Sequence, residues 1–422
     1  MQNIQYFFLF INLLGAMGYS LIAPLYPPMA IKKGVSLSVC GIVLSLFSFT
    51  QIIIIINTPY LIAKFGRKKL LNITIVIQSL CTFLYAILES FNGFGFLLLS
   101  FVARIFHGIG CGTTSVISYS YTSLLNEGDE LKKVMGYMEL SFSAGTTIGP
   151  LIVSVFYHLG GYKLPFIVCG LLNCLGIVGF YYFTFPEEEN EKNDNNNNND
   201  KNTSVLPLLL QRDIFLFAFS GMIQLNVQSF FFPTLTNYLM TYFNMSIETS
   251  SFYFLLPVIG YLICLQFVAK IIDKLGMKFT VVVGLFVSFI GSLFLAPAPF
   301  LPYSIITIAI GLLILGADAA LINIPMFLGI NETIKQNYQI EEAEAGDKAS
   351  AIFNLAFNLG DVWSPILGGY ITSAFKFEYS SYCAGIMCLL TSWLVYSVYK
   401  KQIMDYLSEK KINLKEKMLN LV

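Results

Sequence analysis

Charged side chains are scarce in this sequence. Lys, Arg, Asp and Glu make up 12% of the 422 residues, whereas apolar residues make up 56%. Soluble domains contain about 25% charged residues. A soluble fold of this length would leave too much surface without charge, so the composition excludes that class. The mean hydropathy of +0.69 indicates a protein that crosses a membrane several times.

The patterns that hold metals, nucleotides or nucleic acids are also missing. The sequence has two histidines, and its eight cysteines form no C-x-x-C pair, so we expect no metal site. It contains no G-x-x-x-x-G-K-[ST] segment, so we do not expect ATP to drive the protein directly. With 25 positive and 25 negative side chains, no nucleic-acid partner is indicated. We expect no enzymatic activity and no cofactor.

What the sequence does have is apolar runs of membrane-spanning length. A helix needs about 20 apolar residues to cross the hydrocarbon, which predicts an all-α membrane protein with twelve transmembrane helices. The runs lie at approximately 5–27, 39–59, 70–88, 95–119, 134–157, 164–185, 214–240, 251–269, 279–296, 303–329, 349–375 and 379–399.

A polar stretch divides these runs into two groups of six. Residues 186–201 read PEEENEKNDNNNNNDK, a composition that buries no apolar surface and is typical of a solvated linker. We therefore predict an N-terminal six-helix bundle over 1–185, a linker over 186–212, a C-terminal six-helix bundle over 213–400 and a basic tail over 401–422.

Lys and Arg are distributed unequally between the two sides of the predicted spans. The tail and the segments after even-numbered spans hold 20 of them, and the segments after odd-numbered spans hold four. Positive side chains accumulate on the cytosolic side, so both termini and the linker are predicted to be cytosolic. We expect a multi-pass protein of a vesicle or vacuole membrane rather than of the plasma membrane.

The two groups of spans repeat each other. The segment AKFGRKKLL at 63–71 is matched by DKLGMKFTV at 273–281, and GTTIGPLIV at 145–153 by GDVWSPILGGY at 360–370. Parallel repeats of this kind are typical of transporters whose site lies between two pseudo-symmetric bundles near the bilayer midplane.

The first repeated segment resembles the signature loop of the Major Facilitator Superfamily. Gly66, Arg67 and Lys68 match it in the first half, and Asp273 and Gly276 match it in the second. The first copy departs from the signature, because its first glycine and its aspartate are replaced by other residues.

Two further segments carry the same resemblance. Arg104 and Gly108 match the R-x-x-x-G pattern of the family's fourth helix, and Gly145, Gly149 and Pro150 match the G-x-x-x-G-P pattern of its fifth. The second pattern favours exchange over uptake. Together the motifs imply the family's fold and a structural or gating role for these positions.

A narrower resemblance is to the vesicular amine transporters, and within them to the vesicular polyamine transporters. It rests on the segments 19–36, 136–150 and 341–370. It implies proton-coupled antiport of organic cations by alternating access, with the lipid bilayer, a cationic small molecule and protons as partners and a monomeric state. His107 departs from this resemblance, since an acidic residue is expected there.

Ionisable residues inside the predicted spans are functional candidates, because a charge at the bilayer centre costs several kcal/mol. Glu139, Asp318 and Asp361 are predicted to bind the cation or the proton. For Glu139 the alternative is a stabilising pair with Arg104, for Asp361 an ion pair or a helix end facing water, and for Asp318 an interhelical hydrogen bond. Arg104 is predicted to be a structural or gating anchor, and His107 either a proton relay or a buried neutral histidine.

Polar and aromatic residues on three predicted helices are further candidates for a cavity lining. Tyrosines seven residues apart share a helix face and offer cation–π surface. Three prolines, Pro24, Pro27 and Pro28, predict a break near the end of the first helix. The lining candidates are Tyr19, Tyr26, Asn226, Asn354 and Asn358.

The N-x-[ST] pattern for N-linked glycosylation occurs four times, at Asn72, Asn202, Asn244 and Asn331. With the predicted orientation only Asn244 lies on the non-cytosolic side. We expect it to lie too near the bilayer to be modified.

Two other functions are compatible with the sequence. The first is a facilitator or drug exporter of the same fold that moves a neutral or anionic solute. The second is a membrane receptor or scaffold without transport, which only the altered first signature loop supports, with Pro59 and Ala63 at the changed positions.

Overall fold

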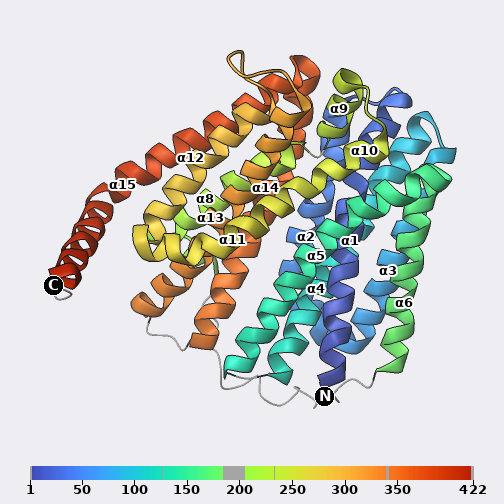
Figure 1. The fold of residues 1–422 in the computed structure, drawn as a ribbon. Helices are drawn as coiled ribbons and strands as arrows, with labels where there is room; N and C mark the ends of the chain where they lie inside the picture. Colours follow the sequence, from blue (N-terminus) through green and yellow to red (C-terminus); the bar gives the residue numbers. More distant parts are fainter. Residues whose placement is uncertain (1, 127, 184–204, 232, 339–341, 420–422) are drawn as a thin grey trace. The chain divides into compact units, whose positions relative to one another are not determined.

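Long α-helices form nearly all of the structure, a computed structural model that describes residues 2–126, 128–183, 205–231, 233–338 and 342–419 (Figure 1). Twelve helices in these ranges have 19 or more residues, and no strand occurs in the same ranges. They are α1 (Gln2–Lys32), α2 (Leu37–Phe65), α3 (Arg67–Ile87), α4 (Gly93–Leu125), α5 (Gly128–Gly160), α6 (Lys163–Tyr182), α8 (Arg212–Phe231), α11 (Leu256–Leu275), α12 (Met277–Leu295), α13 (Ile305–Tyr338), α14 (Glu342–Ala374) and α15 (Phe377–Leu419).

Eleven of the helices in the described ranges are long and apolar enough to cross a membrane. The remaining long helix, α14, carries Asn354, Asn358 and Asp361 in its apolar part, and polar residues in a span are tolerated where they face protein or a cavity. The predicted all-α fold with twelve membrane helices is confirmed.

Five short elements in the described part of the chain join or interrupt the long helices. The predicted span 214–240 is divided, because α8 ends at Phe231 and Pro233 lies in the turn that follows. Proline has no N–H to continue a helix, and this break is invisible to hydropathy. The short elements are η1 (Leu88–Ser90), α7 (Val205–Leu208), α9 (Leu235–Phe243), α10 (Ile247–Phe252) and η2 (Tyr253–Leu255).

The predicted break in the first helix is wrong. Helix α1 continues to Lys32 with Pro24, Pro27 and Pro28 inside it. All three prolines are buried. Each proline removes one backbone hydrogen bond from the helix. Membrane helices tolerate this loss where neighbouring helices pack around the chain.

The chain forms two compact units. Unit 1 comprises residues 1–202, 232–255 and 362–374, and unit 2 comprises 203–231, 256–361 and 375–422. Two segments from the second half of the sequence thus pack with unit 1: the hairpin of α9 and α10, and the end of α14. Most of the predicted linker lies outside the described residues, and the predicted tail from residue 401 begins inside α15.

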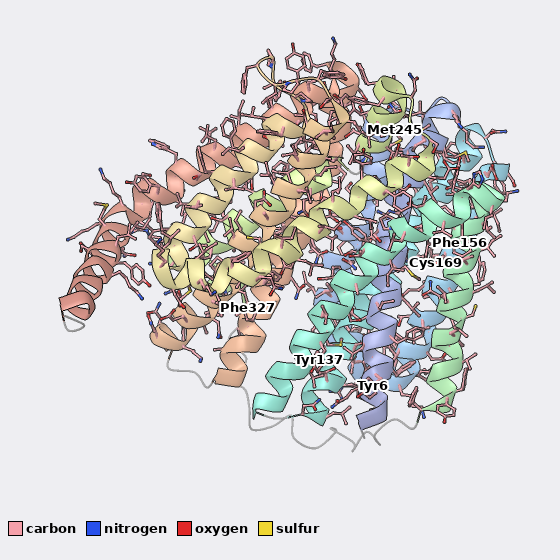
Figure 2. The ribbon with its side chains drawn as sticks, in the orientation of Figure 1. Tyr6, Tyr137, Phe156, Cys169, Met245 and Phe327 are labelled. Carbon is pink, nitrogen blue, oxygen red and sulfur yellow. The ribbon has the colours of Figure 1, made fainter. Side chains whose placement is uncertain are left out.

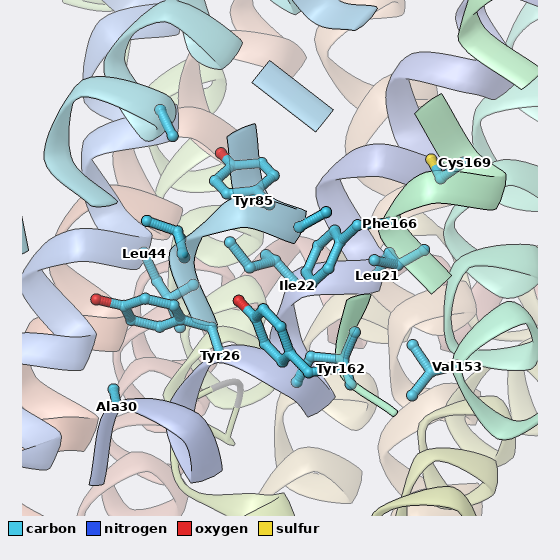
Figure 3. Packing of buried hydrophobic residues seen from close by; sticks show 14 of the residues in the cluster. Leu21, Ile22, Tyr26, Ala30, Leu44, Tyr85, Val153, Tyr162, Phe166 and Cys169 are labelled. Carbon is cyan, nitrogen blue, oxygen red and sulfur yellow. The ribbon is translucent and has the colours of Figure 1, made fainter. Parts of the chain in front are cut away.

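The core of unit 1 forms around α1. Leu21, Ile22 and Tyr26 of α1 pack with Tyr85 of α3 and Phe166 of α6 (Figure 3). In a membrane, where lipid is as apolar as these side chains, such a core is held together by close van der Waals packing. The outer surface is also apolar, and Tyr6 and Tyr137 are exposed on it (Figure 2), as expected for helices that face lipid.

Two glycines bring α5 against α1. A Cβ at Gly145 would overlap the carbonyl oxygen of Leu13, and one at Gly149 would overlap the hydroxyl of Ser20. Small residues let helix backbones approach closely in membranes. The G-x-x-x-G-P pattern of the fifth helix therefore has a packing role in this structure.

The repeated signature loops have the same backbone geometry. Gly66 between α2 and α3 has φ 79°, and Gly276 between α11 and α12 also has φ 79°. In both turns the glycine N–H bonds to the carbonyl four residues before it, at Ile62 (2.8 Å) and Ile272 (2.7 Å). Residues with a Cβ rarely adopt this φ. The two repeats therefore share a backbone conformation as well as a sequence pattern.

Candidate functional site

Asp318 lies in the interior of unit 2, on α13. Its side chain is 1% exposed. The Nε2 of Gln224 on α8 donates to Oδ1 at 3.2 Å, and the hydroxyl of Ser288 on α12 donates to Oδ2. No Lys, Arg or His in the described part of the chain forms an ion pair with this carboxylate. Asp318 is therefore a deeply buried acid held by neutral donors from two neighbouring helices.

Asp361 is the second buried acid of unit 2. It lies on α14 and is 7% exposed. The hydroxyl of Ser229 on α8 donates to its Oδ1. Helix α8 thus supplies a hydrogen bond to each of the two carboxylates, through Gln224 and Ser229. Asn226, between these two residues, is buried as well.

Sequence reasoning missed Ser229 and Ser288. A serine in an apolar run is common and carries no signal by itself. The only available hint was its spacing from another polar residue on the same helix, such as Gln224 before Ser229. The partner helix, which decides the role of the hydroxyl, is set by the tertiary fold.

Arg104 is the buried cation of unit 1. Its side chain is 2% exposed, and Nη2 donates to the carbonyl of Leu44 on α2 at 3.0 Å. The guanidinium carbon lies 4.9 Å from the ring centre of Phe47 and 5.9 Å from that of Tyr19. Its Nε and Nη1 are buried without a hydrogen-bond acceptor among the described residues. The Arg104 guanidinium therefore anchors α4 to α2. No carboxylate among the described residues forms an ion pair with it.

His107 lies one helical turn after Arg104. Its Nδ1 is 3.3 Å from the hydroxyl of Tyr85 on α3, and its ring centre lies 5.1 Å from that of Phe47. Arg104, His107 and Tyr19 therefore meet around the ring of Phe47. Tyr26 is fully buried in a different contact, stacked on Phe96 at 5.7 Å.

Asn354 and Asn358 precede Asp361 on the same helix, α14. Glu139 belongs to α5, but its side chain is outside the described part of the structure. On α14, Asn358 donates from Nδ2 to the carbonyl of Asn354 at 3.0 Å. Gly66, Arg67 and Lys68 form the turn between α2 and α3 and the start of α3.

A cavity of about 360 Å³ with both polar and apolar lining opens in unit 2 beside the second signature loop. The Nζ of Lys278 lies there, 2.8 Å from the carboxylate of Asp213 and 2.6 Å from Oε1 of Gln402. The hydroxyl of Tyr406 donates to the carbonyl of Asp273. These contacts tie α8, α12 and α15 together, and neither Asp318 nor Asp361 lines this cavity. Within the described residues no group of three or more His, Cys, Asp or Glu is placed to hold a metal.

Comparison with known proteins agrees with this architecture. A model of the Major Facilitator Superfamily matches residues 8–339. The rat MFS-type transporter SLC18B1 is 24% identical over 387 residues, which cover 90% of this chain and 82% of that protein. The quinolone resistance protein NorA of Staphylococcus aureus is 25% identical over 178 residues, 42% of this chain and 44% of that protein.

A solved structure shows the same fold. The inward-facing, unoccupied form of a bacterial homologue of the human lysosomal transporter Spinster superposes with a TM-score of 0.74 at 10% sequence identity, covering 94% of this chain and 97% of that one. The family match spans well over half of the sequence, and the fold agrees with it. The chain belongs to the Major Facilitator Superfamily and is a multi-pass secondary transporter.

Proposed function

We propose that this transporter exchanges protons for organic cations, with amines or polyamines as the cation. The observation that carries the proposal is Asp318, a carboxylate 1% exposed inside unit 2 and hydrogen-bonded to Gln224 and Ser288. An ionised carboxylate in such surroundings is costly unless a proton or another cation neutralises it. A proton and an ammonium group therefore compete for one negative charge, which is the requirement for exchange.

Asp361 gives the exchange a second acidic group. Ser229 donates a hydrogen bond to Asp361, and Gln224 donates one to Asp318. Both donors lie on α8. We assign the attraction of the cation to Glu139, Asp361 and Asp318. The amides of Asn226, Asn354 and Asn358 then orient its ammonium groups.

The bundles expose the site to the two sides of the membrane in turn. A proton-rich compartment protonates a carboxylate and releases the cation, and the proton leaves to the cytosol. The proposal places both termini in the cytosol and the monomeric protein in a vesicle or vacuole membrane. The similarity to SLC18B1 and the resemblance of segments 19–36 and 341–370 to vesicular polyamine transporters support it.

A second candidate function is transport of an anionic solute or drug export. Arg104 favours an anion, because its guanidinium is buried and two of its nitrogens lack acceptors among the described residues. The partial similarity to NorA is a further observation in favour of export.

Purified protein in liposomes distinguishes these functions. The assay measures uptake of labelled spermidine, spermine and a monoamine, with and without an acidic lumen. We expect cation accumulation that requires the pH gradient and is abolished in Asp318→Asn and Asp361→Asn. Asp405→Asn removes an exposed carboxylate of α15 and serves as the matched control with full transport. Retained transport in the double variant Glu139→Gln and Asp361→Asn would favour a neutral or anionic solute.

A further inference from the structure

The hairpin of α9 and α10 is longer than a membrane crossing requires. Helices α8 and α11 contain 20 residues each, about 30 Å at 1.5 Å per residue, which equals the hydrocarbon thickness. The 24 residues 232–255 lie between these two helices. The apolar stretch Ile247–Leu275 has 29 residues, about 44 Å at 1.5 Å per residue, whereas the hydrocarbon is about 30 Å thick. With α11 in the hydrocarbon, the residues before Leu256 lie outside it.

Within unit 1 this hairpin lies at the end opposite the N-terminus (Figure 1). Met240 and Ile247 of the hairpin pack in the cluster that contains Leu25 and Ala30, near the C-terminal end of α1. The beginning of α1 packs in a separate cluster, at Ile4 and neighbouring residues. Because the N-terminus is proposed to be cytosolic, the hairpin faces the non-cytosolic compartment.

Asn244 occupies the turn of this hairpin. Asn244 caps the C-terminal end of α9. Its φ is 51°, and its backbone N–H donates to the carbonyl of Leu239. Asparagine tolerates this left-handed conformation better than most residues. Leu239 and Ile247 are buried on the packed face of the hairpin, whereas the Asn244 side chain is exposed. The adjacent Met245 marks the turn in Figure 2.

The sequon Asn244-Met245-Ser246 therefore lies on the accessible side of a projecting turn. Asn244 is 13 residues after the end of α8 and 12 before the start of α11. The expectation that it lies too near the bilayer rests on spans that end at 240 and begin at 251, and the structure interrupts both runs, at Pro233 and at η2. The hydroxyl of Ser246 caps α10 by accepting from the N–H of Thr249.

The other sequons in the described residues differ from this one. Asn72 lies within α3 and donates to the hydroxyl of Tyr181 at 3.2 Å. Asn331 lies within α13, and its Oδ1 is buried. Asn202 lies outside the described residues. On the proposed orientation these three are cytosolic.

We propose that Asn244 is a site of N-linked glycosylation. The donor is an oligosaccharide linked to a polyprenyl diphosphate. The amide Nδ2 of Asn244 forms a bond to the anomeric carbon of the sugar while the bond from that carbon to the diphosphate oxygen breaks. The polyprenyl diphosphate leaves, and one amide proton passes to solvent through the transferase. The site depends on the proposed orientation and not on the transported solute.

The test is translation of the full chain with eukaryotic microsomes, followed by gel electrophoresis with and without peptide-N-glycosidase. Wild type is expected to show a slower band that the glycosidase removes. Asn244→Gly abolishes the acceptor while suiting the positive φ, and it should lose the slower band. Ser246→Thr keeps both the sequon and the cap of α10, and it should retain the band. A glycoprotein translated in parallel verifies that the microsomes are competent.

Three results would overturn the site. One is a wild-type chain without the glycosidase-sensitive band in competent microsomes. Another is a band that persists in Asn244→Gly. The third is a band that disappears in Asn72→Gln or Asn331→Gln, which would also reverse the orientation. None of these results bears on amine transport in liposomes. The glycosylation proposal and the transport proposal can therefore fail independently.

Discussion

At the scale of single residues, each of the two buried aspartates of unit 2 receives a hydrogen bond from a serine on another helix. An aspartate in an apolar run is visible in the sequence because its charge is costly in a membrane. The hydroxyls that bond to Asp318 and Asp361 come from residues 30 and 132 positions away. Only the folded chain brings such pairs together. The structure likewise places Arg104 on the carbonyl of Leu44 and the ring of Phe47, two contacts without a sequence signal.

Ser288→Ala removes one of the hydrogen bonds that Asp318 receives. Leaving a buried polar group short of a partner costs about 1–3 kcal/mol, so we expect the free energy of unfolding in detergent to fall by that amount. The loss should be smaller in an Asp318→Asn background, because a neutral amide demands less from its donors; this double-mutant comparison isolates the pair. Ser397→Ala removes an exposed hydroxyl of α15 and should change little. Equal losses in both backgrounds would contradict the assignment.

Arg104→Met replaces the buried guanidinium with an apolar side chain of similar length. Among the described residues this charge has no counterion, and such a buried charge costs more than one hydrogen bond contributes, so the melting temperature should equal or exceed that of wild type. Arg212→Met, at an exposed position, serves as the control for loss of charge. Uptake of the amine should persist in Arg104→Met. A drop of several degrees would show that the guanidinium stabilises the packing of α4 on α2. A loss of transport confined to anionic substrates would point to the anion-binding alternative.

At the scale of elements, helix existence was predictable and helix interruption was not. Hydropathy counts apolar residues and does not register backbone geometry, so α8 with α9 resembles one span despite the turn at Pro233. The opposite error occurred in α1, where three prolines lie inside a continuous helix. Packing decides such cases. The glycines of α5 form a motif that is visible in the sequence, and in the structure they allow the close approach to α1.

Gly149→Ala tests this approach. Its Cβ would overlap the Ser20 hydroxyl of α1, and overpacking costs about 1–3 kcal/mol. We expect a lower melting temperature and reduced transport, because the contact of α5 with α1 must shift. Gly95→Ala on α4 is the matched control, since its Cβ would lie 3.7 Å from the nearest atom. Similar stability of the two variants would show that α1 and α5 separate without cost.

At the scale of the whole molecule, composition identified the class and the charge bias predicted the orientation. The family follows from the match over residues 8–339. The grouping of residues 232–255 and 362–374 with unit 1 had no signal in the sequence, because it depends on long-range packing.

Single cysteines in a variant without the eight native ones test the predicted orientation. Microsomes present their cytosolic face outward. An impermeant maleimide should label Lys410→Cys directly and Thr241→Cys only after the vesicles are permeabilised. Both positions are exposed. Labelling in the reverse order would place the termini on the other side of the membrane.

The two hydrogen bonds that α8 gives to Asp318 and Asp361 have a consequence for kinetics. Gln224 and Ser229 lie on the same helix, α8. An axial shift of this helix by one residue, about 1.5 Å, would therefore lengthen both hydrogen bonds together. Occupancy at one acid is then communicated to the other without direct contact between them. A protein connected in this way should respond to protons cooperatively, with a Hill coefficient above one, and Ser229→Ala should return the response to that of independent sites.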